Sequence, residues 1–191
     1  MSVFLAWVPD GDARRTIADL LEVAKVALAT DGARHRWRRP DQWHMTLRHL
    51  GDQVAPSMRE RIDARMGDIV RAVPPHHADL EVLDAWRGAN VLVLRTALPP
   101  PLGGLFDAVE AAMRACGFSA EGKSERPHVT LAYLDSQAWP SATALPGLPG
   151  ELPAFAIDRV SLLENPGTGR YRTLAEWPLA GDGRAAQANL F

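Results

Sequence analysis

The chain has 191 residues, of which 47% are hydrophobic and 23% charged, and its formal net charge is -2. This composition supports one sizeable core or two closely packed lobes and argues against a second independent domain. The small net charge excludes a strongly basic coat for nucleic acid, so any contact with RNA is expected to stay local to a cleft.

The sequence has no feature typical of a membrane or secreted protein. No run approaches the roughly 18 apolar residues of a membrane span, and the apolar residues 3–8 lack the basic stretch that precedes the core of a secretion signal. A single cysteine, Cys116, rules out an intramolecular disulfide and fits a reducing compartment. We expect a cytoplasmic monomer with no membrane contact, in which residues 1–180 form one two-lobed domain and residues 181–191 a loosely ordered tail.

The first half of the chain predicts a strand, a helix and a second strand. Residues 2–8 are apolar and typical of a strand, and residues 9–12 indicate a turn or helix start. Apolar residues then recur at helical spacing over residues 17–28. The tetrapeptide His44–Leu47 follows, and in an extended backbone its His and Thr point to one face and its two apolar residues to the other.

The second half of the chain repeats this order. Residues 90–96 predict a strand, residues 98–104 a turn, and residues 105–117 a helix with one apolar face. The segment His128–Leu131 then repeats the pattern His-x-Thr-Leu. Strand, helix, spacer and His-x-Thr strand thus occur twice, which indicates a duplicated unit whose copies face each other across a cleft.

The polar side chains of the two motifs suit chemistry at phosphorus. The ordinary pKa of imidazole is near neutrality, so His44 and His128 can divide general base and general acid catalysis between them. The hydroxyls of Thr46 and Thr130 can donate hydrogen bonds to non-bridging phosphoryl oxygens. This combination suits in-line displacement at phosphorus without a metal or another cofactor.

The residues around the motifs resemble those of the 2H phosphoesterases, and within them the LigT-like RNA 2',3'-cyclic phosphodiesterases. The most specific matches are residues 43–51 and 126–132, and residues 155–164 and 169–174 look like the family's closing strands. The resemblance implies an α+β fold in which two pseudo-symmetric lobes of antiparallel sheet, with helices outside, flank a central cleft.

The resemblance also implies an activity. The substrates are RNA termini or small nucleotides with a 2',3'-cyclic phosphate, which water opens to a 2'-phosphomonoester. His128 then acts as the base that activates water, and His44 as the acid that protonates the departing ribose oxygen. Thr46 and Thr130 hold the phosphoryl oxygens. From the residues alone, the two histidines are interchangeable in these roles.

Two positions depart from the family pattern. The family usually has Phe where this chain has His49, and its second motif commonly ends in Arg where this chain has Tyr133. Strand alternation places Arg48 on the catalytic face and turns His49 and Tyr133 away from it. We therefore expect Arg48 to supply the cation for the substrate, with Arg126 as a second candidate. Tyr133 can reach the cleft only if its strand twists or bulges there.

Other side chains near the motifs allow two interpretations each. Trp43 is a candidate for stacking on a nucleobase, as are Trp37 and Trp86, although an isolated tryptophan often belongs to the core. The arginines within residues 36–39 form a solvated charged run or steer a phosphate.

Two patterns farther along the chain predict no site. His76 and His77 follow two prolines, so we expect them in a loop, pointing in different directions. Because no Cys pair or carboxylate stands at ligand spacing, they do not predict a metal site. The segment Gly167–Arg170 is too short for a phosphate-binding fingerprint and is expected to form a turn between the closing strands.

Rival functions remain open. The same chemistry could act on 2'-5' oligonucleotides or on an ADP-ribose cyclic phosphate. A third alternative is a non-catalytic nucleotide-binding module of the same fold, against which the two intact His-x-Thr motifs argue.

Overall fold

The computed structural model describes residues 1–29, 33–120, 126–139, 145, 147–148, 150 and 152–181. The strands are β1 (Ser2–Trp7), β2 (Arg36–Trp37), β3 (Met45–Gly51), β4 (His76–Ala78), β5 (Leu80–Trp86), β6 (Val91–Thr96), β7 (His128–Tyr133), β8 (Phe155–Ile157), β9 (Arg159–Asn165) and β10 (Arg172–Pro178). The helices are α1 (Gly11–Ala27), α2 (Pro56–Ala72) and α3 (Pro100–Ala115), with short 3-10 turns at Pro40–Gln42 and Ser136–Ala138.

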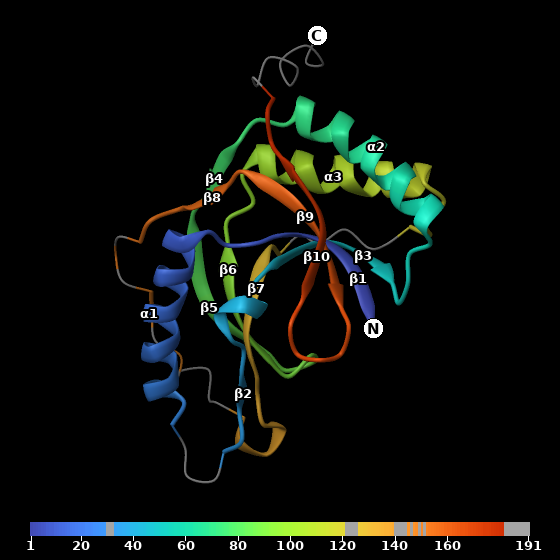
Figure 1. Ribbon diagram of the computed structural model, residues 1–191. Helices are drawn as coiled ribbons and strands as arrows, with labels where there is room; N and C mark the ends of the chain where they lie inside the picture. Colours follow the sequence, from blue (N-terminus) through green and yellow to red (C-terminus); the bar gives the residue numbers. More distant parts are fainter. Residues whose placement is uncertain are drawn as a thin grey trace.

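The main sheet joins the two halves of the duplicated unit. Its strand order is β10-β9-β1-β3-β7-β6-β5, β2 pairs with β7, and β4 and β8 form a separate two-stranded sheet. The two His-x-Thr strands, β3 and β7, are therefore neighbours at the centre (Figure 1). Their ladder consists of the single pair Met45 and Val129. The predicted α+β fold of two antiparallel halves is confirmed, and the halves meet at this pair.

The helices are positioned by local signals at their first turns. The carboxylate of Asp10 accepts a hydrogen bond from the backbone N–H of Ala13 and caps α1. Helix α3 begins at Pro100, where proline is tolerated because the first helical N–H has no partner within the helix. The turn expected over residues 98–104 is therefore wrong beyond Pro99.

Helices α2 and α3 pack together, and α3 lies against β3, so a helix of the second half covers a strand of the first (Figure 1).

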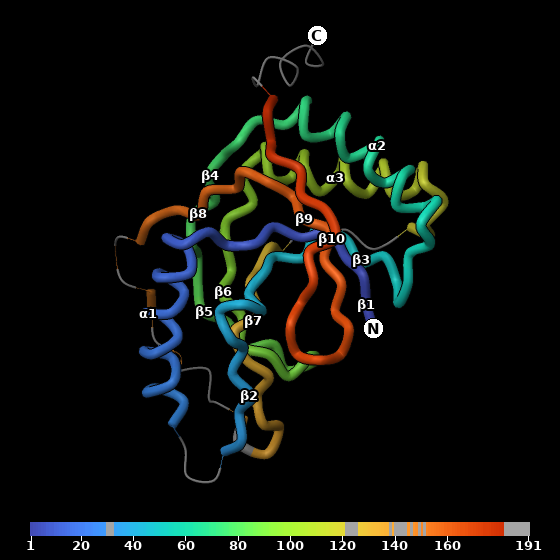
Figure 2. Tube along the Cα trace, viewed as in Figure 1, coloured from blue at the N-terminus to red at the C-terminus, as the bar shows by residue number. Residues whose placement is uncertain are grey.

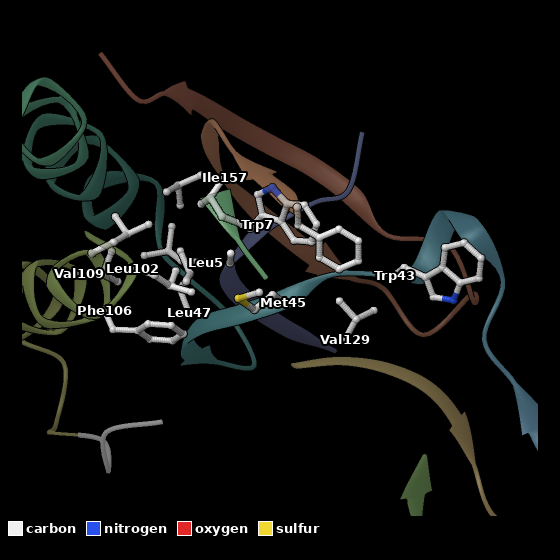
Figure 3. Close-up of a cluster of buried hydrophobic side chains, with 14 of the residues drawn as sticks. Leu5, Trp7, Trp43, Met45, Leu47, Leu102, Phe106, Val109, Val129 and Ile157 are labelled. Atoms are coloured by element: carbon white, nitrogen blue, oxygen red, sulfur yellow. The ribbon is translucent and has the colours of Figure 1, made fainter. Parts of the chain in front are cut away.

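The core lies between the helices and the apolar face of the sheet. Met45 and Val129 are fully buried there, which confirms that the apolar residues of both motifs point to the core. Figure 3 shows Leu47 in the same buried cluster, facing Leu102 and Phe106 from α3. The opposite face of the sheet is therefore the one that the histidines and threonines share.

Three predicted loop segments have different outcomes. His76 and His77 do not lie in a loop but in β4, which pairs with β8, because the strand begins directly after the two prolines. The turn at Gly167–Arg170 is confirmed between β9 and β10, where Gly167 and Gly169 both adopt a φ of 83° that glycine accommodates without a steric cost. The tail predicted at residues 181–191 lies outside the described residues except for Gly181.

In the described part of the chain, no helix has the length and apolar character to cross a membrane.

Candidate active site

The two motif histidines are oriented by the same local hydrogen bond. Nδ1 of His44 lies 2.9 Å from the carbonyl oxygen of Gln42, and Nδ1 of His128 lies 2.9 Å from that of Arg126. Since a carbonyl oxygen can only accept, Nδ1 carries the proton in each ring. In the neutral state, Nε2 of each imidazole is therefore left with a lone pair, as a general base requires.

The register of the central strands brings the two motifs together. Met45 of β3 is paired with Val129 of β7 in an antiparallel ladder. One residue on either side of this pair, the histidine of each motif stands opposite the threonine of the other motif. All four side chains leave the sheet on the face opposite the core. They are His44, Thr46, His128 and Thr130, and each is partly buried.

Aromatic rings surround the two imidazoles. The ring of His44 lies 4.8 Å from Phe4 and 5.2 Å from Tyr171, measured between centroids. The ring of His128 packs edge-on against Trp86 at 4.5 Å. These contacts restrict the rotation of both imidazoles and exclude water from their sides. Trp86, one of the tryptophans that the sequence left open, thus lies at the site.

The surroundings favour the neutral form of both imidazoles. Burial lowers the pKa of His44 to about 4, against the opposing effect of its hydrogen bond to Gln42 and with further lowering by Arg38 and His128. Burial also lowers the pKa of His128, partly offset by its hydrogen bond to the Arg126 carbonyl. An anion bound between the two rings would oppose these effects, because a nearby negative charge favours an imidazolium.

A β-bulge follows the threonine of the first motif. Thr46 is paired with Ala6 of β1, but the next residue of β1, Leu5, is paired with Arg48. Leu47 is therefore the extra residue of β3, and it reverses the alternation of the side chains after it. As a result Arg48 turns toward α3, on the core side of the sheet.

The expectation that Arg48 supplies a cation to the site is wrong. Its side chain is buried, with only 7% exposed, and its guanidinium forms an ion pair with Glu110 of α3 at 2.6 Å. It also donates hydrogen bonds to the backbone carbonyls of His49 and Ser119. The same bulge places His49 on the catalytic face, because its strand partner is Phe4, whose ring contacts His44. Sequence alternation had assigned His49 to the opposite face.

A matching bulge follows the threonine of the second motif. Thr130 is paired with Val93 of β6, and Leu92, the preceding residue of β6, is paired with Ala132. Leu131 is the extra residue here. The bulge brings Tyr133 to the same face as Thr130, so the alternation that turned Tyr133 away from the cleft fails here too.

The structure places at the site one of the arginines for which the sequence left two alternatives open, a solvated charged run or the steering of a phosphate. The guanidinium carbon of Arg38 lies 5.5 Å from the ring centroid of Tyr133 and 5.6 Å from that of Tyr171. Arg38 also donates a hydrogen bond to the hydroxyl of Tyr171. The guanidinium of Arg36 also lies over Tyr133, 4.9 Å from its ring centroid. The sequence pointed to this position of Arg38 only through the alternative that the arginines of residues 36–39 steer a phosphate.

Two further predicted substrate contacts have different outcomes. Trp43 is only 2% exposed and belongs to the core, so it offers no face for a nucleobase. Figure 3 shows it among the buried side chains, to the right of Met45. The side chain of Arg126 is exposed, and its role as a substrate contact stays a prediction. Across the described ranges, no three His, Cys, Asp or Glu side chains are grouped so that they could hold a metal ion.

Comparison with known proteins places this arrangement in a family. The family model of the 2'-5' RNA ligase superfamily matches residues 7–169. TT0787 of Thermus thermophilus superposes with a TM-score of 0.75 at 18% identity, covering 95% of this chain and 100% of the other. E. coli LigT complexed with 3'-AMP superposes with a TM-score of 0.71 at 24% identity, and LigT complexed with phosphate with 0.70 at 23%; each match covers 93% of this chain and 96% of LigT. No curated protein matches the sequence. The chain belongs to the 2'-5' RNA ligase superfamily of 2H phosphoesterases.

Proposed function

We propose that the protein hydrolyses 2',3'-cyclic phosphates at RNA termini or on small nucleotides and releases 2'-phosphomonoesters. The observation that carries this proposal is the crossed arrangement of the motifs, in which each histidine stands opposite the threonine of the other. In-line attack needs a base on one side of phosphorus and an acid on the other. Two imidazoles with free Nε2 atoms, on one face of the sheet, meet that need without a bound cofactor.

The reaction follows from assigning one role to each side chain. Nε2 of His128 takes a proton from water as the water oxygen attacks phosphorus. The bond from phosphorus to the ribose 3' oxygen breaks, and protonated Nε2 of His44 donates its proton to that oxygen. The hydroxyls of Thr46 and Thr130 donate hydrogen bonds to the non-bridging oxygens, whose charge increases in the transition state.

Substrate binding supplies the protonation state that the acid needs. The empty site keeps His44 neutral at neutral pH, since its pKa is lowered to about 4. A bound phosphodiester anion offsets the positive charge of Arg38 and accepts a hydrogen bond from the imidazolium, so the pKa of His44 rises in the complex.

The substrate class is supported by the site and by the relatives. The small net charge of -2 argues for a local contact with a terminus or nucleotide rather than with a long duplex. Structures of LigT with phosphate and with 3'-AMP make a nucleotide phosphate a reasonable ligand for a chain of the same fold.

A substrate panel tests the proposal. Turnover and binding are measured together for a 2',3'-cyclic nucleotide, a 2'-5' dinucleotide, a 3'-5' dinucleotide and an ADP-ribose cyclic phosphate. We expect the highest kcat/KM for the 2',3'-cyclic nucleotide. Preference for the 2'-5' dinucleotide or the ADP-ribose compound would replace the proposed substrate. Binding of all four without turnover would identify a non-catalytic module.

A further inference from the structure

Strand β2 brings a guanidinium to the edge of the catalytic face. Arg36 and Trp37 pair with Tyr133 and Ala132 of β7. The backbone N–H of Arg38 then donates a hydrogen bond of 2.7 Å to the carbonyl of Leu131. Because Leu131 is the bulged residue of the second motif, this bond holds Arg38 beside the part of β7 where the strand exposes Tyr133 to the site.

The contacts of Arg38 leave its positive charge without a carboxylate. Its side chain is partly buried, and its partners are two tyrosine rings and the hydroxyl of Tyr171. No Asp or Glu within the described residues forms an ion pair with it. By contrast, Arg39 pairs with Asp41 at 3.0 Å, and Arg48, on the core side of the sheet, pairs with Glu110 at 2.6 Å. A partly buried guanidinium with only neutral partners is suited to bind an anion.

The position of Tyr171 is fixed by the segment that also orients His44. The carbonyl oxygen of Gly169 accepts hydrogen bonds from the side chains of Arg39 at 2.6 Å and Gln42 at 2.7 Å. Gln42 also accepts the hydrogen bond from Nδ1 of His44 through its backbone. The loop between β9 and β10, traced in orange to red in Figure 2, is thereby tied to the chain just before β3. Tyr171 and His44 are thus held by one network.

We propose that Arg38 binds the phosphoryl anion of the substrate beside His44, and that Tyr133 and Tyr171 hold its guanidinium in place. The proposal rests on the proposed function for the identity of the anion. Arg38 would supply, from the segment directly after β2, the cation that the family pattern places at position 133. The tyrosine at that position then serves as a surface on which the guanidinium lies.

Binding of inorganic phosphate and of a nucleoside 2'-monophosphate tests the proposal without turnover. The variant Arg38→Gln removes the charge, and Arg38→Lys keeps it but loses the forked donor geometry. Arg36→Gln is the matched control, since it removes an exposed arginine two residues earlier in the chain that lies over the same tyrosine. Calorimetry gives the affinities, and NMR of the His44 ring gives its pKa in the empty protein.

We expect Arg38→Gln to weaken binding of both anions roughly 10- to 150-fold, the range of a charge-assisted hydrogen bond. Arg38→Lys should recover part of this loss, and Arg36→Gln should stay within about threefold of wild type. The pKa of His44 should rise in Arg38→Gln, because a positive charge beside the ring is removed. This rise shows that the charge of Arg38 acts at His44, and the loss of anion affinity relative to Arg36→Gln shows that the same charge binds the phosphoryl group.

Kinetics separates the failure of this proposal from that of the proposed function. If wild type opens a 2',3'-cyclic nucleotide and Arg38→Gln matches Arg36→Gln in anion affinity and kcat/KM, Arg38 does not bind the phosphoryl group, while the proposed function stands. If wild type opens no cyclic phosphate but binds phosphate through Arg38, the proposed reaction is wrong and the anion site stands. Thermal unfolding of each variant shows whether it is folded, and Arg38→Lys is compared in place of Arg38→Gln if the latter is not.

Discussion

His44 and His128 present their rings in the same way, each with Nδ1 2.9 Å from the carbonyl oxygen two residues earlier in the chain. His76 makes the same local bond to Pro74, at 3.0 Å. The bond therefore sets the tautomer of an imidazole but does not by itself make a site. The motif histidines differ from His76 in that adjacent central strands place them on one face beside two threonines.

The first prediction concerns the two imidazoles as proton carriers. His44→Ala and His128→Ala should each lower kcat on a 2',3'-cyclic nucleotide by on the order of 10² to 10⁴, since each removes one of two proton transfers. His77→Ala changes an exposed histidine of β4 and should leave kcat unchanged. Incubation with EDTA should have no effect on wild type. Loss of activity on chelation and its return with a divalent ion would disprove the metal-independent mechanism.

The second prediction concerns the bond that breaks. If His44 protonates the 3' oxygen, the product is the 2'-phosphate, which phosphorus NMR distinguishes from the 3'-phosphate. The uncatalysed hydrolysis, which gives a mixture, serves as the reference spectrum. A predominant 3'-phosphate would mean that the histidines exchange roles or that the substrate binds in the reverse orientation.

The third prediction concerns stability in acid. The pKa of His44 is lowered to about 4 in the folded protein from 6.5, so the unfolded chain binds the proton more readily. Stability is therefore complete above pH 6.5 and falls as the pH drops from 6.5 toward 4, by on the order of 3 kcal/mol from this group.

Urea unfolding at about pH 7 and about pH 4.5, values chosen to span this titration, measures the contribution. His44→Asn lacks the titrating group, so its free energy of unfolding should fall less between the two pH values than that of wild type. Comparing the two proteins cancels the effect of carboxylates that also titrate in this range. Equal losses would show that the pKa of His44 is not lowered in the folded protein.

The fourth prediction separates Arg48 from Arg38. Arg48→Met breaks the ion pair with Glu110 and should lower the free energy of unfolding by roughly 2 to 3 kcal/mol, because this buried charge-assisted contact between β3 and α3 is lost. The kcat/KM of the protein that remains folded should stay within about threefold of wild type. If Arg48→Met is stably folded but loses much of its kcat/KM, Arg48 contributes to the catalytic face and its placement on the core side is wrong.

Local patterns in the sequence were enough to predict the repeated unit and the four polar residues of the motifs, whereas the α+β fold was predicted from the resemblance to the 2H phosphoesterases. Alternation along a strand decides which side chains share a face, and Met45 and Val129 do lie in the core. The order of elements also indicated the duplication, since each half carries its own strand, helix and His-x-Thr strand. Helix α2 and strand β5 were not predicted, because neither carries a motif that links it to the repeat.

Tertiary structure decided which residues complete the site. Leu47 and Leu131 each add a residue to a strand directly after the threonine, and a bulge forms only where the partner strand pairs around it. This reversed the alternation, which sent Arg48 to α3 and brought Tyr133 to the catalytic face. Arg38 reached the same face because β2 pairs with β7, a contact between segments far apart in the chain that no local pattern specifies.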